Sequence, residues 1–240
     1  MFKLNYLIRI FQVILNTYMI KKKIKILVIF GSGLHAKICL NEFLKTYVIE
    51  KVFFFDKLNY KTDIQVLNKK IILIKNFQNL KKITNRNTYF FLGIGDNILR
   101  KKIYDEVISK IEKLKWLKLL SKDTIIDKSV KIGEGTAIMP GVVINFQSII
   151  KDHCIINTSS SIDHDCFVDS FVNLSPGVNV AGNVKIERFT KIGIGASVSH
   201  NLNIKQNVVI GANSFVNKDC ETNKTYYGIP IKAYNQKENK

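Results

Sequence analysis

Residues 126–144 of this chain read IDKSVKIGEGTAIMPGVVI, and an isoleucine stands at every sixth position of the stretch. The same spacing of branched aliphatic residues continues without a break to Val216, which gives 16 positions in one phase. The full set is Ile126, Ile132, Ile138, Ile144, Ile150, Ile156, Ile162, Val168, Leu174, Val180, Ile186, Ile192, Val198, Ile204, Ile210 and Val216. A helix repeats its apolar face about every 3.6 residues and a strand every two, so neither produces this period.

A six-residue period is typical of a parallel β-helix built from hexapeptide repeats, whose coils bury apolar surface only against their neighbours. Three hexads complete one triangular coil, so residues 18 positions apart should stack, and the 16 hexads predict about five coils. Small side chains often follow four positions after the aliphatic, because a narrow prism has little room at its corners. They include Val130, Thr136, Ser148, Cys154, Ser160, Cys166, Val178, Ala196 and Ser214.

The N-terminal half has a different pattern, in which apolar runs alternate with polar turns and amphipathic segments. The expected strands are 24–30, 51–55, 71–74 and 89–94, and the expected helices are 35–46 and 98–113. This alternation indicates a small Rossmann-like α/β domain. We therefore predict three parts: an extension of uncertain status over 1–22, the Rossmann-like domain over 23–118, and the β-helix over 119–235.

Polar residues follow three of the expected strands. Gly31-Ser32-Gly33 and His35 follow the first, Asp56 follows the second, and the turn 95–97 follows the fourth. Ligands of open α/β sheets bind beyond the carboxyl ends of the strands, and a phosphate or sugar can rest on a helix start such as the one after Gly33. The alternative is that these residues only form tight turns, since Gly-Ser-Gly without a third glycine is a weak dinucleotide signal.

The chain is strongly basic, with 37 Lys and Arg against 19 Asp and Glu in 240 residues and a formal net charge of +18. Lysine, isoleucine and asparagine are abundant throughout, which favours a general compositional origin of the charge over a nucleic-acid or membrane partner. No nucleic-acid-binding motif is present, and no nucleic-acid partner is expected. A basic surface would favour small anionic ligands such as nucleotide sugars or coenzyme A.

The four cysteines do not have the spacing of a metal or redox site. Cys154, Cys166 and Cys220 occupy the small-residue position of a hexad and should face the prism interior, and Cys39 falls in an expected helix. There is no Cys-x-x-Cys pair, and a cytoplasmic location follows by default.

The first twenty residues, MFKLNYLIRIFQVILNTYMI, are apolar but interrupted by polar side chains, so they make a poor membrane span. They also lack the cleavage site of a signal peptide. An interfacial amphipathic helix is one reading. The preferred one is a dispensable extension with Met19 as the natural start, and membrane association is not expected.

One pair of histidines occupies equivalent hexad positions. His164 and His200 are 36 residues apart, which is two coils, so they should share one edge of the prism about 10 Å apart, with Gly182 between them. Asp163 and Asp165 flank His164, and a carboxylate that orients an imidazole suits a general base. His153 has a different position, so a three-histidine zinc site like that of γ-class carbonic anhydrases is disfavoured and no metal is expected. The alternative for His200 and His153 is that both are plain surface residues.

Several longer motifs carry a resemblance to a known family. They are GSGLHAK (31–37), GIGDNILRKKIY (93–104), MPGVVIN (139–145), NTSSSIDHDC (157–166), SPGVNVAGNVKI (175–186) and YYGIP (226–230). Over residues 24–234 the chain resembles bacterial sugar acetyltransferases of the sialic acid O-acetyltransferase group, especially the nucleotide-amino-sugar N-acetyltransferases.

This resemblance implies an N-terminal domain that holds a sugar nucleotide, a left-handed β-helix that binds acetyl-CoA, and a homotrimer with active sites between subunits. It implies a role in surface polysaccharide synthesis, with His164 as the catalytic base and Asp165 as its helper. The implied substrate contacts are Gly31, Ser32, Gly33, His35, Asp56, Lys57, Asn97 and Asn157. The implied acetyl-CoA contacts are Asn173, Gly182, Gly195 and His200, with the Gly182 amide donating to the thioester carbonyl.

The chain departs from the family pattern at three positions. Leu34 replaces a residue that is more often glycine, Asn173 stands where many members carry a histidine, and Asp165 is shorter than the glutamate common in amino-sugar members. The expected activity is acetyl-CoA-dependent N-acetylation of an amino sugar. O-acetylation of sialic acid and a non-catalytic nucleotide-sugar-binding scaffold are the alternatives.

Overall fold

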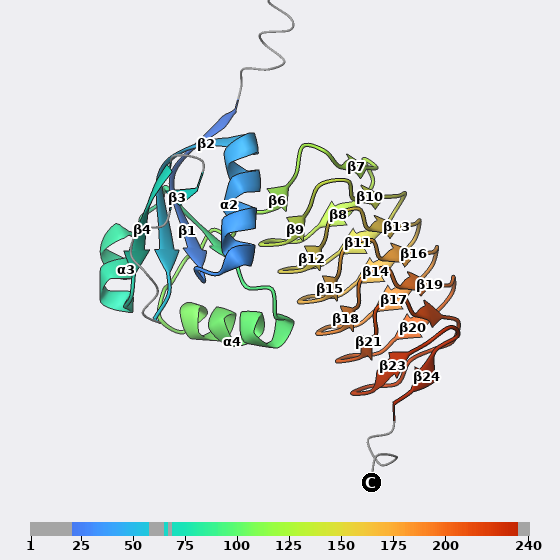
Figure 1. Ribbon diagram of the computed structural model, residues 1–240. Helices are drawn as coiled ribbons and strands as arrows, with labels where there is room; N and C mark the ends of the chain where they lie inside the picture. The colour runs from blue at the N-terminus through green and yellow to red at the C-terminus, as the bar shows by residue number, and fades with distance from the viewer. Residues whose placement is uncertain (1–20, 58–64, 67–68, 235–240) are drawn as a thin grey trace, which may run out of the picture.

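The computed structural model describes residues 21–57, 65–66 and 69–234. Figure 1 shows two parts side by side, a sheet with helices and a stack of triangular coils. The expected extension over residues 1–18 and the expected start at Met19 lie outside the described residues. The elements of the first part are β1 (Lys22–Phe30), α2 (Leu34–Thr46), β2 (Tyr47–Phe55), β3 (Gln65–Val66), β4 (Lys69–Ile74), α3 (Phe77–Ile83), β5 (Thr88–Leu92) and α4 (Asn97–Ile108).

The first part is built on one sheet with the order β3-β4-β2-β1-β5. Strands β4, β2, β1 and β5 run parallel, whereas the short β3 is antiparallel to β4. Side chains on both faces of β1 are buried, as the continuous apolar run predicts. The carboxyl ends of the four parallel strands therefore meet at one edge of the sheet.

The end of α4 and the presence of α3 differ from the expectations for this domain. The helix expected over 98–113 ends at Ile108, because the chain turns there so that Ile111 is buried and Trp116 forms a bridge to Phe90. The helix α3 was not predicted, although Asn76 caps it by accepting a hydrogen bond from the Asn79 amide at 2.9 Å. Seven residues with one buried position give too weak a periodic signal to be recognised.

The second part is a parallel β-helix of two- and three-residue strands. They are β6 (Leu119–Leu120), β7 (Ile125–Ile126), β8 (Lys131–Ile132), β9 (Ala137–Ile138), β10 (Val143–Ile144), β11 (Ile149–Ile150), β12 (Ile155–Ile156), β13 (Ser161–Ile162), β14 (Phe167–Val168), β15 (Asn173–Leu174), β16 (Asn179–Val180), β17 (Lys185–Ile186), β18 (Lys191–Ile192), β19 (Ser197–Val198), β20 (Asn203–Ile204), β21 (Val209–Ile210), β22 (Phe215–Val216), β23 (Thr225–Tyr227) and β24 (Lys232–Ala233).

The strands form three sheets, one for each face of the prism. We call them face 1 (β7, β10, β13, β16, β19, β22), face 2 (β8, β11, β14, β17, β20) and face 3 (β6, β9, β12, β15, β18, β21, β23, β24). Ile144, Ile162 and Val180 pair in register on face 1, so the predicted stacking of residues 18 apart is confirmed. The coil begins earlier than the periodic run, at Leu119.

The small residues of the hexads do more than fit the corners. The Ser148 hydroxyl donates to the Asp163 carbonyl at 2.6 Å and accepts from the Cys166 amide at 3.0 Å. Thr136 makes the same two bonds, to Lys151 and from Cys154. Hydroxyls and thiols at this position therefore satisfy backbone groups buried at the corners, where an unpaired group would be destabilising.

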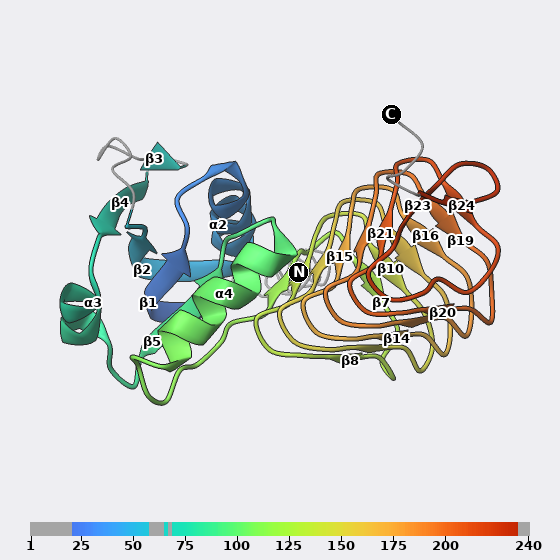
Figure 2. The ribbon, with the colours of Figure 1, turned by 90° about the horizontal axis from the view of Figure 1, so that it is seen from below.

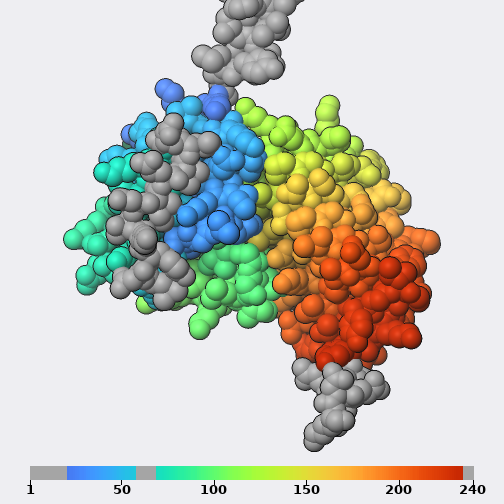
Figure 3. Space-filling model, in the orientation of Figure 1, coloured from blue at the N-terminus to red at the C-terminus, as the bar shows by residue number. Residues whose placement is uncertain are grey.

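The first part packs against face 3 and the corner between faces 2 and 3. Ala137, Met139 and Ile155 of face 3 share a buried cluster with α2 and β1. Phe171, at the corner between faces 2 and 3, joins the cluster on the other side of the sheet, around Phe90. Figure 3 shows the two parts in continuous contact. Faces 1 and 2 remain outside this contact, and Figure 2 shows β10, β16 and β19 on the side away from the helices.

Candidate active site

The β-helix carries a cavity of about 440 Å³, and the N-terminal part carries a larger one of about 650 Å³. The larger one opens at the carboxyl edge of the parallel sheet, between the starts of α2 and α4. Its walls include three segments that follow strands, Gly31–His35, Asp56–Lys57 and Gly93–Asp96. Phe55, Leu99 and Ile103 add apolar surface, so the cavity combines apolar walls with polar groups, as small-molecule sites do.

Ser32 and Asp56 fix the two loops at the floor of this cavity. The Asp56 carboxylate accepts from the Ser32 amide at 3.0 Å and from the Ser32 hydroxyl at 2.7 Å. Gly31 adopts φ +94°, which favours glycine, and its amide donates to the Phe55 carbonyl. Leu34, which is 78% exposed, lies at the mouth where the resemblance expects glycine.

The far wall carries charged groups. Lys57 forms an ion pair with Glu106 of α4, and Lys102 also lines the cavity. The Lys57 hydrogen bond, the largest influence, holds the pKa of the Glu106 carboxyl below its usual range. Lys57 and Lys102 share the cavity lining with the carboxylates of Asp56, Asp96 and Glu106, so the cavity presents both cations and anions to a ligand.

His35 lies in the same cavity in its neutral form. Burial, and next the positive charge of Arg100, lower its pKa to about 4. Its Nε2 is 3.5 Å from the Cys39 Sγ. A neutral imidazole has one nitrogen that accepts and one that donates, so His35 can either donate a hydrogen bond to a ligand hydroxyl or accept one from it.

Arg100 joins the cavity loop to the β-helix. It is 1% exposed, and its guanidinium donates to the carbonyls of Ile94 and Gly95 at 2.8 and 3.0 Å. The same group donates to the His153 carbonyl at 3.0 Å and approaches the Phe171 carbonyl at 3.5 Å. Burial lowers its pKa to about 10, which still leaves it charged at neutral pH.

Two asparagines connect the same parts. Asn97 donates from its side chain to the Phe189 carbonyl at 2.6 Å, and Asn173 on β15 donates to the Gly95 carbonyl at 2.8 Å. Asn97 is therefore buried between the two parts and does not line the cavity. Sequence patterns did not reveal the role of Arg100, and its place within GIGDNILRKKIY was the only signal.

His153 is a core residue at the junction of the two parts. Its ring packs against Tyr104, Trp116 and Phe171, with centroids 4.7, 4.9 and 5.2 Å away, and only 3% of the residue is exposed. Its Nδ1 is buried without a hydrogen bond. Burial, and next the charge of Arg100, lower its pKa to about 3. It is thus a neutral aromatic packing residue rather than the surface residue that the sequence suggested.

We predict that His153 makes the protein sensitive to acid. Histidine in an unfolded chain has a pKa near 6.5. Below that pH, His153 is therefore protonated in the unfolded chain but stays neutral in the folded one. Stability is complete above about pH 6.5 and falls as pH drops toward 3, by about 1.4 kcal/mol per pH unit for this residue. Urea unfolding of His153→Phe at pH 7.5, 6 and 5 should show a shallower loss than wild type. His200→Asn, at an exposed site, should keep the wild-type slope, and equal slopes in all three proteins would contradict the prediction.

His164 lies at the corner between faces 1 and 2, with 56% of its side chain exposed. Its Nδ1 is 2.9 Å from the Asp165 carboxylate, which raises the pKa of the imidazole. Asp163 accepts from the His164 amide at 2.9 Å and from the Asn145 side chain at 3.0 Å, which fixes the turn. With Nδ1 bound as a donor to Asp165, Nε2 is left as the proton acceptor.

Gly182 provides the surface on which this imidazole lies. A Cβ on Gly182 would stand 2.6 Å from the His164 Nε2, closer than real contacts allow. The amide of Asn183 donates to the His164 carbonyl and that of Asn201 to the Gly182 carbonyl, so His164, Gly182 and His200 follow one another along one edge. The smaller cavity runs beside this edge, along face 1, and Asp163, Ala181 and Ser199 line it.

The predicted site residues therefore fall in separate places within one chain. Gly31, Ser32, Gly33, His35, Asp56 and Lys57 line the larger cavity, whereas His164, Asp165, Gly182 and His200 share the corner between faces 1 and 2. Asn157 and Gly195 lie at the corner between faces 3 and 1, and Asn173 contacts the cavity loop. No residue lines both cavities.

Comparisons with known proteins match both parts. Residues 26–107 match the PglD N-terminal domain family. Two structures of the acetyltransferase domain of PglB from Neisseria gonorrhoeae FA1090, one in complex with acetyl coenzyme A, are 27% identical with TM-scores of 0.77 and 0.78. Each alignment covers 88% of this chain and 100% of the other.

Two further structures have the same architecture. PerB from Caulobacter crescentus, in complex with CoA and GDP-perosamine, is 27% identical with a TM-score of 0.76, over 87% of this chain and 97% of the other. WeeI from Acinetobacter baumannii AYE is 20% identical with a TM-score of 0.75, over 89% of this chain and 100% of the other, and this likeness concerns the fold.

Proposed function

We infer that this chain is an acetyl-CoA-dependent N-acetyltransferase of nucleotide-linked amino sugars, a member of the nucleotide-amino-sugar N-acetyltransferases with a left-handed hexapeptide β-helix. The match to the PglD N-terminal domain and the likeness to the acetyltransferase domain of PglB and to PerB, over 88% and 87% of this chain, support this family, and the resemblance expected from the sequence is confirmed. The observation that carries the activity is the His164 imidazole, held by Asp165 and lying on Gly182.

The proposed reaction is a direct transfer in a ternary complex. The sugar amine attacks the thioester carbonyl of acetyl-CoA while the His164 Nε2 takes a proton from the amine, and the CoA thiolate then leaves. Asp165 holds the Nδ1 proton and stabilises the imidazolium that forms. We assign the Gly182 amide to the carbonyl oxygen, where negative charge develops. The four free cysteines are buried, so none is placed to form an acyl-enzyme.

The larger cavity is the proposed site of the sugar nucleotide. Lys57 and Lys102 would face its phosphates, and neutral His35 would bond a hydroxyl. Acetyl-CoA is assigned to the groove along face 1, beside Gly182 and His200. Gly195 and Asn157 belong to the opposite corner of face 1, so their assigned contacts would be made across an interface with another copy.

A panel of nucleotide sugars tests the function. Purified protein is incubated with acetyl-CoA and UDP-, GDP- or dTDP-linked 4-amino sugars, and thiol release is followed together with the mass of the sugar product. Growth of one product by an acetyl group on nitrogen supports the proposal. An ester product would favour sialic acid-type O-acetylation, and binding of nucleotide sugar with no thiol release would favour a non-catalytic scaffold.

We predict that Gly182→Ala impairs transfer more than folding. Gly182 is buried beneath the His164 ring, and a methyl group there would collide with that ring and push its Nε2 out of position. The expected result is a loss of kcat of about ten- to a hundredfold, because a displaced base loses only some of the rate that a general base contributes. Circular dichroism and melting temperature should stay near wild type.

We predict a closed three-fold homotrimer. The nucleotide cavity and the His164 corner do not meet within one chain, so a neighbouring copy is needed to complete each site, and three-fold closure does this without open filaments. Light scattering should give a mass three times that of the chain. A fully active monomer would refute both the assembly and the shared site.

We place the enzyme in the cytoplasm. Its four cysteines are free, as a reducing compartment favours, and acetyl-CoA would be supplied there. Among the described residues, no helix is long and apolar enough to cross a membrane.

A further inference from the structure

The positive charge of the chain is concentrated in one part. Residues 21–118 contain 22 Lys and Arg against 8 Asp and Glu, whereas residues 119–234 contain 11 against 10. An even distribution of lysine along the chain was expected, and this count contradicts it. One gene encodes both parts, so a general compositional bias would give both parts a similar excess of Lys and Arg. The excess belongs to the N-terminal domain itself.

Part of this charge gathers where the parallel strands begin. We call the basic rim the exposed residues Lys22, Lys23, Lys25, Lys51, Lys70 and Arg86. The strand register places them side by side, because Ile26 pairs with Lys51 and with Thr88, and Val52 pairs with Ile71. Lys51 and Lys70 are thus neighbours on adjacent strands, where like charges repel unless an anion lies nearby.

The rim contains a recess. A cavity of about 380 Å³ is lined by Lys25, Lys51 and Arg86, together with Glu50, Asn85 and Asn87. Three cations with two amide side chains match the chemistry of a phosphate group. None of the three cations has an ion pair with a carboxylate within 4.0 Å among the described residues, in contrast to Lys57 and Lys45.

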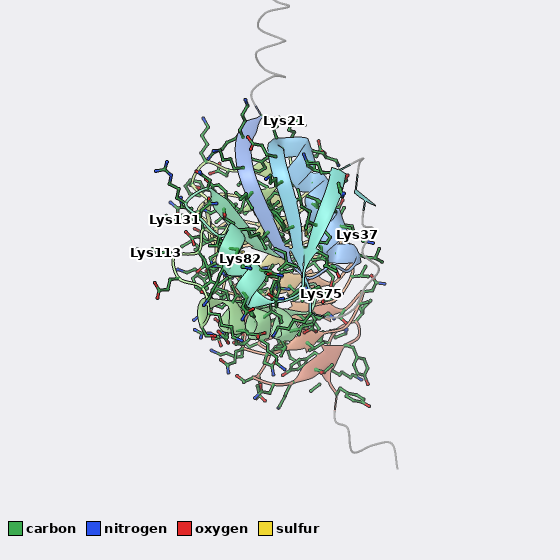
Figure 4. All side chains as sticks on the ribbon, turned by 90° about the vertical axis from the view of Figure 1, so that its left-hand side faces the viewer. Lys21, Lys37, Lys75, Lys82, Lys113 and Lys131 are labelled. Carbon is green, nitrogen blue, oxygen red and sulfur yellow. The ribbon has the colours of Figure 1, made fainter. Side chains whose placement is uncertain are left out.

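The rim lies at the opposite end of the strands from the nucleotide cavity. Figure 4 shows Lys21, which precedes β1, at the upper end of the sheet, and Lys75, which follows β4, lower down. The twenty residues before Lys21 lie outside the described residues, and their sequence has 14 apolar or aromatic side chains and only Lys3 and Arg9 as charges. An apolar sequence therefore joins the chain at the basic rim.

We propose that the basic rim binds the anionic surface of a phospholipid bilayer, with the recess at Lys25, Lys51 and Arg86 taking lipid phosphate groups. Clustered lysine and arginine bind such surfaces, and an adjacent apolar segment strengthens the binding. The nucleotide cavity then opens away from the bilayer, toward soluble substrate. This revises the expectation that the chain has no membrane partner, and it does not depend on the proposed transfer activity.

Vesicle sedimentation of the full chain tests the proposal. The vesicles are phosphatidylcholine alone or with one-third phosphatidylglycerol, at about 0.1 M and about 1 M salt. We expect binding to the anionic vesicles at low salt and release at high salt. The triple variant Lys25→Glu, Lys51→Glu, Arg86→Glu should bind at least about tenfold more weakly, since each charge contributes about fivefold.

A matched variant separates the rim from total charge. Lys128→Glu, Lys218→Glu, Lys232→Glu changes the net charge equally on the β-helix and should bind like wild type. Both variants should keep the wild-type rate of acetyl transfer and melting temperature. Equal weakening in both, or binding of an RNA homopolymer in place of vesicles, would overturn the proposal.

A chain starting at Met19 provides the second test. It should keep full transfer activity and a weaker, salt-sensitive affinity for anionic vesicles, because the rim is retained. Complete loss of binding in this chain, with normal binding by the rim variant, would place the contact in the first residues and refute the role of the rim.

Discussion

His164→Ala is expected to lower kcat by about 10²–10⁴-fold, the usual share of a general base. In the proposed complex the imidazole contacts the nucleophile rather than the nucleotide of the cofactor, so the affinity for acetyl-CoA should change little. Steady-state rates with both substrates, together with acetyl-CoA titration by calorimetry, measure the two effects separately. The loss should be confined to the chemical step.

Two neighbours serve as comparisons. Asp165→Asn should reduce kcat less than His164→Ala, and it should move the rising limb of the pH–rate profile to lower pH, because the carboxylate raises the pKa of the imidazole. His200→Ala lies one coil beyond Gly182 and should act mainly on the KM for acetyl-CoA. Near wild-type turnover in His164→Ala with none in His200→Ala would show that the wrong histidine has been chosen.

Arg100→Met is expected to be the most destabilising single change at the junction of the two parts. It leaves the carbonyls of His153 and Ile94 without the Arg100 donor, whereas the Gly95 carbonyl keeps the Asn173 side chain, and each lost buried partner costs about 1–3 kcal/mol. The loop that carries Ile94 and Gly95 forms a wall of the nucleotide cavity. Nucleotide affinity should therefore fall together with the free energy of unfolding, as measured by UDP and GDP titration and by urea unfolding.

Lys101→Met is the matched control, since Lys101 is the next residue of α4 and its charge pairs with Asp105 at the surface. Its effect should stay within about 0.5 kcal/mol. Arg100→Lys keeps the charge but reaches fewer carbonyls, so it should be intermediate. Wild-type stability and nucleotide affinity in Arg100→Met would show that the junction holds without this residue.

The β-helix could be predicted in detail because every coil repeats the same pattern of residues in the sequence. A branched aliphatic every six residues specifies both the buried side chain and the stacking partner, and Ile162 is buried against the neighbours that the spacing predicts. The β-helix begins at Leu119, where its domain was expected to begin, although the six-residue run itself starts only at Ile126. The expected position of His164 on one edge with Gly182 and His200 is confirmed for the same reason, since hexad position alone sets it.

The junction could not be predicted, because its contacts join residues far apart in the chain. Arg100 binds carbonyls 53 and 71 positions away, and any residue has a carbonyl, so no pattern of side chains reveals the partner. His153 illustrates the opposite difficulty. It occupies a corner position that is exposed in an isolated coil, and only the packing of Tyr104 and Trp116 against it makes it part of a core.

The three-sided coil also restricts how the length of this gene can change. Removing 18 residues from the β-helix would take out one full coil and leave every remaining corner above its former partner. Removing six would rotate all that follows by one face, so that every later corner would stand above a different corner of the preceding coils. Viable insertions and deletions in such a chain should therefore occur in whole coils, and the distance between the ends of the prism should change in discrete steps.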